Sequence, residues 1–160
     1  MELLDKVFLL FFSCAQENKV RYMIIGGYAV NYYGYNRNTG DLDIWMAPTN
    51  ENKLAFIQTL LCLNYSEDEV APLYQKDFTQ PFVTTISGDG PTIDFLTVVH
   101  FSLSYDEAES KKEVYEIVPG IFINITPYDF LINMKLKARR DKDLWDVARL
   151  DELKLKNKKK

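Results

Sequence analysis

The chain has 160 residues, of which 47% are apolar and 26% charged, as in an ordinary globular protein with one core. No apolar run approaches the ~20 residues that a membrane-spanning helix needs, so we expect no membrane contact. The net charge of −4 is unevenly spread, because residues 135–160 carry +6 and residues 1–134 carry −10. A basic end on an acidic body favours an anionic partner such as RNA, although a solvated tail that aids solubility explains the same pattern.

The first half of the chain alternates helices and strands. Apolar residues at helical spacing predict a helix over residues 2–17 and another over residues 49–63, the latter begun by an N-cap threonine. Between them, an apolar run over residues 21–25 predicts a buried strand that stops at two glycines. A short helix is expected over residues 28–33, and alternation predicts a second strand over residues 41–46.

The second half adds strands and a helical end. We expect a loop over residues 64–78, strands over 80–87 and 92–97, a short helix over 105–111, and a hairpin of 114–118 with 121–125. Thr126 followed by a proline predicts an N-capped helix start, and the helical C-terminal part covers about 126–155 before a basic tail at 156–160. Without an internal linker, residues 1–160 form a single domain of the α/β (α+β) class: a small mixed sheet flanked by helices, with a C-terminal helical pair.

The start of the chain carries acidic residues before its apolar stretch and no small-residue cleavage site after it, which favours an amphipathic helix over a signal peptide. Cys14 and Cys62 are too few and too far apart for a metal knuckle. We therefore expect two free thiols in a reducing, cytoplasmic setting.

Two glycines and two aspartates form the candidate site. Gly26 and Gly27 end the first strand, where a glycine lets the backbone approach phosphate without a Cβ in the way. Asp41 and Asp43 lie two residues apart on the second strand and therefore point to one face. Two carboxylates on one face beside a glycine turn match the hard oxygen ligands that Mg²⁺ takes, with phosphates and water filling the remaining positions.

A third carboxylate is predicted from the alternating strand at residues 92–97. Asp94 completes a three-carboxylate set if this strand adjoins the first pair, as a metal ligand or as a base for an incoming hydroxyl. Three such groups repel one another unless a cation is bound. Asp89 is the competitor, but it lies between two glycines in a sequence typical of a turn, where aspartate is common for local reasons.

These residues resemble a known superfamily. Gly-Gly-x-Ala from Gly26, followed after a spacer by Arg37-x-Thr39-x-Asp41-Leu-Asp43, is similar to the nucleotidyltransferase superfamily, and within it to the small AbiEii-like proteins. Many of those are toxins of bacterial toxin–antitoxin pairs. The resemblance extends to residues 92–96, 134–136 and 142–146, and leaves residues 50–90 and 100–120 unmatched.

The resemblance implies Mg²⁺-dependent transfer of a nucleoside monophosphate from an NTP to an acceptor hydroxyl, with two Mg²⁺ ions, or Mn²⁺, as cofactor. RNA, for example a tRNA 3′ end, is the implied acceptor, and an antitoxin protein is the implied partner. The implied catalytic residues are Asp41, Asp43, Asp94 and Lys135, the first three also as metal ligands; the implied nucleotide-binding residues are Gly26, Gly27, Arg37 and Thr39.

Several alternatives stay open at this point. Arg37 and Thr39 bind phosphate or simply brace the loop before the aspartates. Lys135 contacts phosphates, or it belongs to a structural clamp: Asp143 and Asp146, which lie three apart on one helix face, pair with Lys135 or with Arg139. The alternative function is a non-catalytic nucleotide- or RNA-binding module, or a partner-regulated pseudoenzyme.

Overall fold

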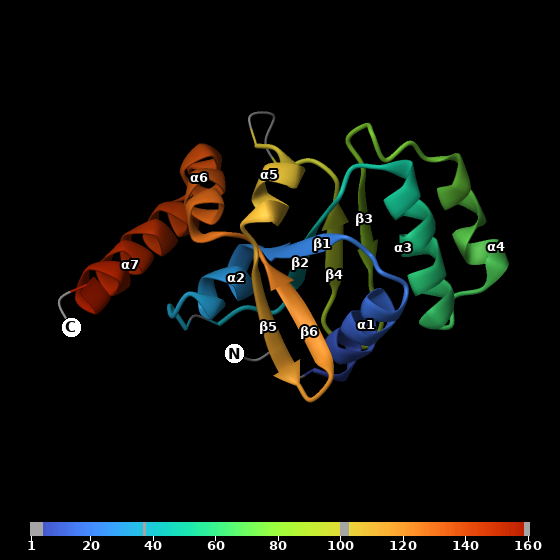
Figure 1. Cartoon of the computed structure of the whole chain (residues 1–160), viewed down its shortest axis with the longest axis horizontal. Coiled ribbons are helices and arrows are strands. Elements are labelled where there is room, and N and C mark those ends of the chain that lie inside the picture. Colours follow the sequence, from blue (N-terminus) through green and yellow to red (C-terminus); the bar gives the residue numbers. More distant parts are fainter. Residues whose placement is uncertain (1–4, 37, 100–102, 159–160) are drawn as a thin grey trace.

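A computed structural model describes residues 5–36, 38–99 and 103–158. It contains a six-stranded mixed sheet in the order β3-β4-β2-β1-β6-β5 (Figure 1). The strands are β1 (Tyr22–Ile25), β2 (Leu42–Met46), β3 (Val83–Ile86), β4 (Ile93–Leu96), β5 (Glu113–Val118) and β6 (Ile121–Ile125). The helices are α1 (Lys6–Glu17), α2 (Gly26–Tyr32), α3 (Asn50–Cys62), α4 (Glu67–Val70), α5 (Tyr105–Ser110), α6 (Tyr128–Ala138) and α7 (Asp141–Lys158), with a 3₁₀ turn over Ala71–Gln75. The predicted class, a mixed sheet flanked by helices with a helical pair at the end, is confirmed.

Strand β2 is central because it pairs antiparallel with β1 and parallel with β4. Its side chains alternate between the two faces of the sheet. Leu42 and Ile44 join the large apolar cluster, whereas Trp45 joins a second, separate cluster. Asp43, which lies between Leu42 and Ile44, therefore shares the face of Trp45.

Each face of the sheet is covered by its own helices. Phenylalanines of α1 and Phe56 of α3 pack with β2 and β4 on one face, and all of these side chains are fully buried. On the other face, Tyr105 and Ala108 of α5 pack with Met23 and Trp45. In Figure 1 the α6–α7 pair lies at the opposite end of the molecule from α3 and α4. On this second face, Asp43 of β2 and Asp94 of β4 line a cleft to which α6 and the start of α7 also contribute.

Three helices differ from the predicted elements. The expected loop contains α4, which opens with a capping box between Ser66 and Glu69. Helix α6 is flanked by Pro127 rather than capped by Thr126, because Thr126 continues the sheet: its N–H donates to the Ile24 carbonyl. Helix α7 runs to Lys158, so most of the expected tail is helical.

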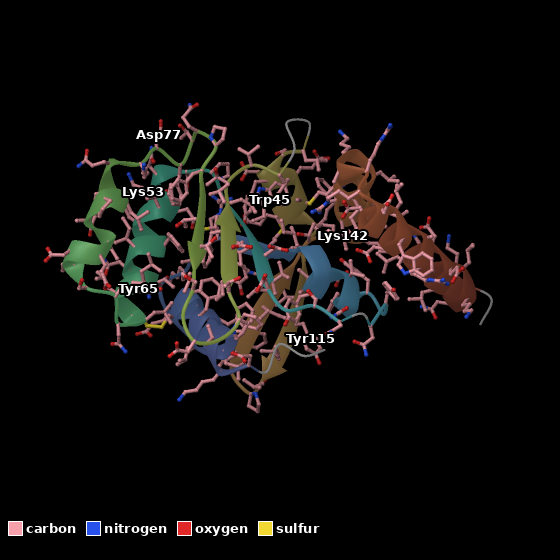
Figure 2. The ribbon with its side chains drawn as sticks, turned by 180° about the vertical axis from the view of Figure 1, so that it is seen from behind. Trp45, Lys53, Tyr65, Asp77, Tyr115 and Lys142 are labelled. Atoms are coloured by element: carbon pink, nitrogen blue, oxygen red, sulfur yellow. A yellow bond between two sulfur atoms is a disulfide. The ribbon has the colours of Figure 1, made fainter. Side chains whose placement is uncertain are left out.

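The expectation of two free thiols was wrong. Cys14 and Cys62 form a disulfide that joins α1 to α3, visible as a yellow bond in Figure 2. Their Cα atoms lie 5.9 Å apart, within the usual range for a disulfide. The two helices pack side by side over the same sheet face, which brings together cysteines 48 residues apart in sequence. Spacing along the chain alone did not reveal this proximity.

Within the described residues, no helix combines the length and the apolar character that crossing a bilayer requires.

Candidate active site

The aspartates of β2 and β4 lie side by side. In the parallel β2–β4 pair, Asp43 is the register partner of Asp94. Partners in register share a sheet face, and Leu42 and Ile93 are buried on the opposite face. The alternation of both strands therefore turns the two carboxylates to the same side. The structure thus brings together two residues that lie 51 positions apart in the sequence.

A glycine is required opposite this pair. Gly26 has φ +70°, which side chains rarely tolerate, and a Cβ built on it would overlap Oδ2 of Asp43. Helix α2 begins at Gly26, two residues before the expected start, and Gly27 is buried in its first turn. The tight approach of α2 to β2 therefore depends on the absence of a side chain at residue 26.

Tyr28 holds the loop that leads to the aspartates. Its ring is buried, and its hydroxyl donates a hydrogen bond of 3.2 Å to the carbonyl of Thr39. Asp41 is exposed just before β2, and its Oδ1 accepts a 3.4 Å hydrogen bond from the N–H of Thr92. Arg37, predicted as a phosphate ligand, lies outside the described residues. The role of Thr39 seen here is to position the backbone of the loop.

The predicted residues converge on one cleft of about 620 Å³. Of the predicted set, its walls include Gly26, Gly27, Thr39, Asp41, Asp43, Asp94 and Lys135. Asp89 is not among the described lining residues; it lies in a separate hollow beside Val7 and Leu10. Asp94, and not Asp89, therefore lies in the same cleft as Asp41 and Asp43.

The cleft raises the proton affinity of one carboxylate. Burial, the negative charge of Asp94 and then that of Asp41 raise the pKa of Asp43 to about 6, while Lys142 and Lys135 oppose the shift. Asp94 is oriented by Thr85 of β3, whose hydroxyl donates to Asp94 Oδ1 at 2.6 Å. The site is therefore a place where negative charge is unfavourable and a cation would be favourable.

Lys135 is engaged in a buried ion cluster. Its Nζ lies 2.9 Å from Oδ2 of Asp146 and 3.6 Å from Oδ1 of Asp143, and all three side chains are at most 6% exposed. Arg140 adds a 2.6 Å contact from Nε to Asp143. Although burial pushes the pKa of Asp143 up, the hydrogen bonds from Arg140 and the charge of Lys135 hold it below its ordinary value. Lys135 thus clamps α6 to α7, as one of the two sequence-based alternatives proposed.

Two cations in the cleft were not singled out from the sequence. Lys142 and Arg140 line the cleft at the start of α7 (Figure 2, Lys142), and Lys142 is exposed. They reach it because Arg139 adopts a left-handed conformation that ends α6 and redirects the chain. Only the resemblance over residues 142–146 pointed to this segment.

The donor chemistry fits a hard divalent cation. Mg²⁺ usually takes one or two protein carboxylates, and water or phosphate completes its coordination. Asp43 and Asp94 supply such a pair, and the raised pKa of Asp43 reflects its burial and then the negative charges held close to it. Across residues 5–36, 38–99 and 103–158, however, no group of three Asp, Glu, His or Cys side chains is close enough to hold a metal ion. Asp41 lines the same cleft as Asp43 and Asp94 but does not form a three-ligand metal group with them.

No protein-family model matches the chain, and a search of curated proteins found no match. The resemblance therefore depends on the motif residues alone.

Proposed function

We propose that the chain is an Mg²⁺-dependent nucleotidyltransferase that moves a nucleoside monophosphate from an NTP to an acceptor hydroxyl. The observation that carries this function is the Asp43–Asp94 pair, in register on parallel strands and facing one cleft. A plain strand end would not need a glycine packed against one of these carboxylates, as Gly26 is against Asp43.

The residues of the cleft have different roles in this proposed reaction. Asp43, with its pKa near 6, is about nine-tenths ionised at pH 7, and Asp94 is held in place by Thr85. Together they would hold the metal, which would supply charge neutralisation for the triphosphate and a lower pKa for the attacking hydroxyl. Lys142 and Arg140 bind the phosphates from the α7 side of the cleft.

RNA is the acceptor that the basic C-terminal region favours, and a tRNA 3′ end is the example that the motif resemblance implies. Residues 135–160 carry +6, and α7 continues this charge to Lys156 and Lys158 in its last turn. Each phosphate neutralised by a lysine releases counterions and steepens the salt dependence of binding. A toxin-like role with an antitoxin partner is proposed from the motif resemblance alone.

Activity is tested by incubating the protein with each labelled NTP, Mg²⁺ and total RNA, and following label transfer to RNA. We expect transfer from at least one NTP, and a loss of more than about tenfold in rate for Asp43→Ala or Asp94→Ala, because a lost metal ligand costs several kcal/mol in the transition state. Asp89→Ala, which removes an aspartate outside the cleft, is the matched control.

A non-catalytic nucleotide- or RNA-binding module is the second candidate. It is favoured by the lack of a three-ligand metal group among the described residues. Nucleotide binding that is independent of Mg²⁺ and unaffected by Asp43→Ala, with no label transfer, would favour this candidate over the enzyme.

A further inference from the structure

Trp145, in the second turn of α7, is an exposed tryptophan whose side chain is held in place. It is 54% exposed, and its indole Nε1–H donates a 2.8 Å hydrogen bond to the hydroxyl of Tyr35. The guanidinium carbon of Arg149 lies over the ring, 4.1 Å from its centroid. Because a guanidinium covers only one face of an indole, the exposed area belongs mainly to the opposite face and the ring edges. The ring is therefore fixed with one face open to solvent.

Both partners of this hydrogen bond lie close to the cleft along the chain. Tyr35 precedes Asn38 by three residues, Trp145 follows Lys142 by three, and both Asn38 and Lys142 line the cleft. Residues three apart on a helix are neighbours, with Cβ atoms about 5–6 Å from each other. Trp145 itself is not among the described residues that line the cleft. It is therefore a neighbour of Lys142 on the surface of α7, just outside the cleft.

Cations continue from the cleft along the same side of α7. Lys142, Arg149 and Lys156 recur every seven residues, a spacing that drifts by only about 20° around a helix. At about 1.5 Å per residue, this row extends over about 21 Å. Arg149 also pairs with Glu152 at 2.9 Å, but an exposed ion pair contributes little and leaves other guanidinium N–H groups for a phosphate. The row leads from the cleft toward the C-terminal end of the molecule (Figure 1).

The two features together match one class of ligand. A row of cations alone is often only a solvated helix surface, and a single exposed aromatic residue is common. Single-stranded nucleic acids, however, are bound by the combination, because their bases stack on aromatic rings while cations follow the phosphates. The bases of a duplex are already stacked on one another, so a duplex gains nothing from the open face of an indole.

We propose that the side of α7 formed by Trp145, Arg149 and Lys156 binds a single-stranded end of the RNA acceptor. This assignment rests on the proposed function, because the terminal hydroxyl of that strand must reach the aspartates of the cleft. A base near the end of the strand stacks on the open face of Trp145. Arg149 and Lys156 contact phosphates farther along the strand. The acceptor is thus RNA with an unpaired end, and not a blunt duplex.

The first test compares RNA with and without unpaired bases. Fluorescence anisotropy measures the affinity of the protein for labelled oligouridylate, alone and as a duplex with oligoadenylate. We expect the single strand to bind tighter than the duplex. Trp145→Ala should weaken single-strand binding by about fivefold or more, the order that stacking of one base on an aromatic side chain supplies. Leu155→Ala, which removes another exposed apolar side chain of α7, is the matched control and should change the affinity by less than about twofold.

A charge-matched pair of variants tests the row of cations. Lys156→Gln should weaken single-strand binding and flatten its salt dependence by about 0.7 in the log–log slope, the value for one contacted phosphate. Lys154→Gln removes the same charge two residues earlier, about 200° around the helix, where the lysine lies over the ring of Tyr128. It should leave the slope unchanged.

The second measurement follows the stacked ring directly. The chain has two tryptophans, and Trp45 is only 1% exposed, so a bound strand contacts the fluorescence of Trp145 alone. Unlabelled oligouridylate should quench the fluorescence of the wild type. In Trp145→Phe, which leaves Trp45 as the sole tryptophan, the same ligand should cause no change.

The two proposals fail in distinguishable ways. Wild-type affinity in Trp145→Ala, equal affinity for single strand and duplex, or no quenching would overturn the strand site. Transfer of label from an NTP to RNA would then still support the enzyme, with its acceptor held elsewhere. Single-strand binding that depends on Trp145, without label transfer from any NTP, would overturn the enzyme and leave an RNA-binding surface. A dimer that Trp145→Ala separates in ultracentrifugation, with RNA affinity unchanged, would assign this surface to a second copy of the chain and overturn the strand site.

Discussion

Replacing Asp43 by asparagine should stabilise the protein at neutral pH while abolishing activity. The side chain keeps its size and place against Gly26 but can no longer carry a charge. Asp43 faces Asp94 and Asp41 in a partly buried cleft, so its charge is unfavourable to the fold when no cation is bound. A residue kept at such a cost is expected to have a role in function.

The magnitude follows from the pKa of Asp43, which is raised from 3.8 to about 6 on folding. Because the folded state holds this proton more tightly, the stabilising contribution of protonated Asp43 is fully present below about pH 3.8. It is lost as the pH rises through about 6, and it stays lost at neutral pH. The full shift corresponds to about 3 kcal/mol, which solvent screening of a partly exposed group reduces to about 1–2 kcal/mol.

Urea unfolding at pH 4.5, 6 and 7.5 in excess EDTA measures this difference. Asp43→Asn should exceed the wild type by about 1–2 kcal/mol at pH 7.5 and by progressively less at lower pH. Asp89→Asn, at an exposed turn, should show no such trend. Replacing EDTA with Mg²⁺ should raise the stability of the wild type by ligand linkage and leave Asp43→Asn unchanged. An advantage that is absent at pH 7.5, or that does not change with pH, would refute the reasoning.

Three further changes test the parts around the cleft. Lys135→Met should lower the free energy of unfolding by about 3–5 kcal/mol, because it leaves two buried aspartates without their lysine; a loss below about 1 kcal/mol would contradict the clamp. Gly26→Ala should melt at a clearly lower temperature than Gly88→Ala, since only residue 26 combines a positive φ with a carboxylate in contact. Serine at both Cys14 and Cys62 should cost about 4 kcal/mol in urea unfolding by the chain-entropy model for a 48-residue separation, and an unchanged midpoint would count against it.

Much of the sheet was predictable because its strands carry period-two patterns. Asp43 and Asp94 each lie between apolar residues, and each strand could therefore be assigned a buried and a polar face from sequence. That pattern does not specify the order of the strands in the sheet. That β4 pairs with β2 depends on long-range packing, and only the motif resemblance suggested it.

The missed features divide into two kinds. The capping box from Ser66 to Glu69 could be recognised in the sequence, and the prediction of a loop there overlooked it. The Cys14–Cys62 disulfide could not be predicted from the sequence, because it depends on how two helices pack. The position of Lys142 could not be predicted either, because it depends on a single left-handed residue between α6 and α7. Local sequence patterns specify individual helices and strands, whereas contacts between residues far apart in the sequence depend on how the faces of those helices and strands pack.

The C-terminal helical pair shows how a clamp and a ligand site can be confused. Lys135 lines the cleft, but its charge is already balanced by the buried carboxylates of Asp143 and Asp146. Lost activity in a Lys135 variant would therefore follow from a displaced α7 as readily as from a lost phosphate contact. Lys142 separates the two causes, because it is exposed in the same cleft. Lys142→Ala should weaken tripolyphosphate binding without lowering the melting temperature. If it lowers neither, the phosphates are held elsewhere, and the clamp is the main contribution of this helical pair.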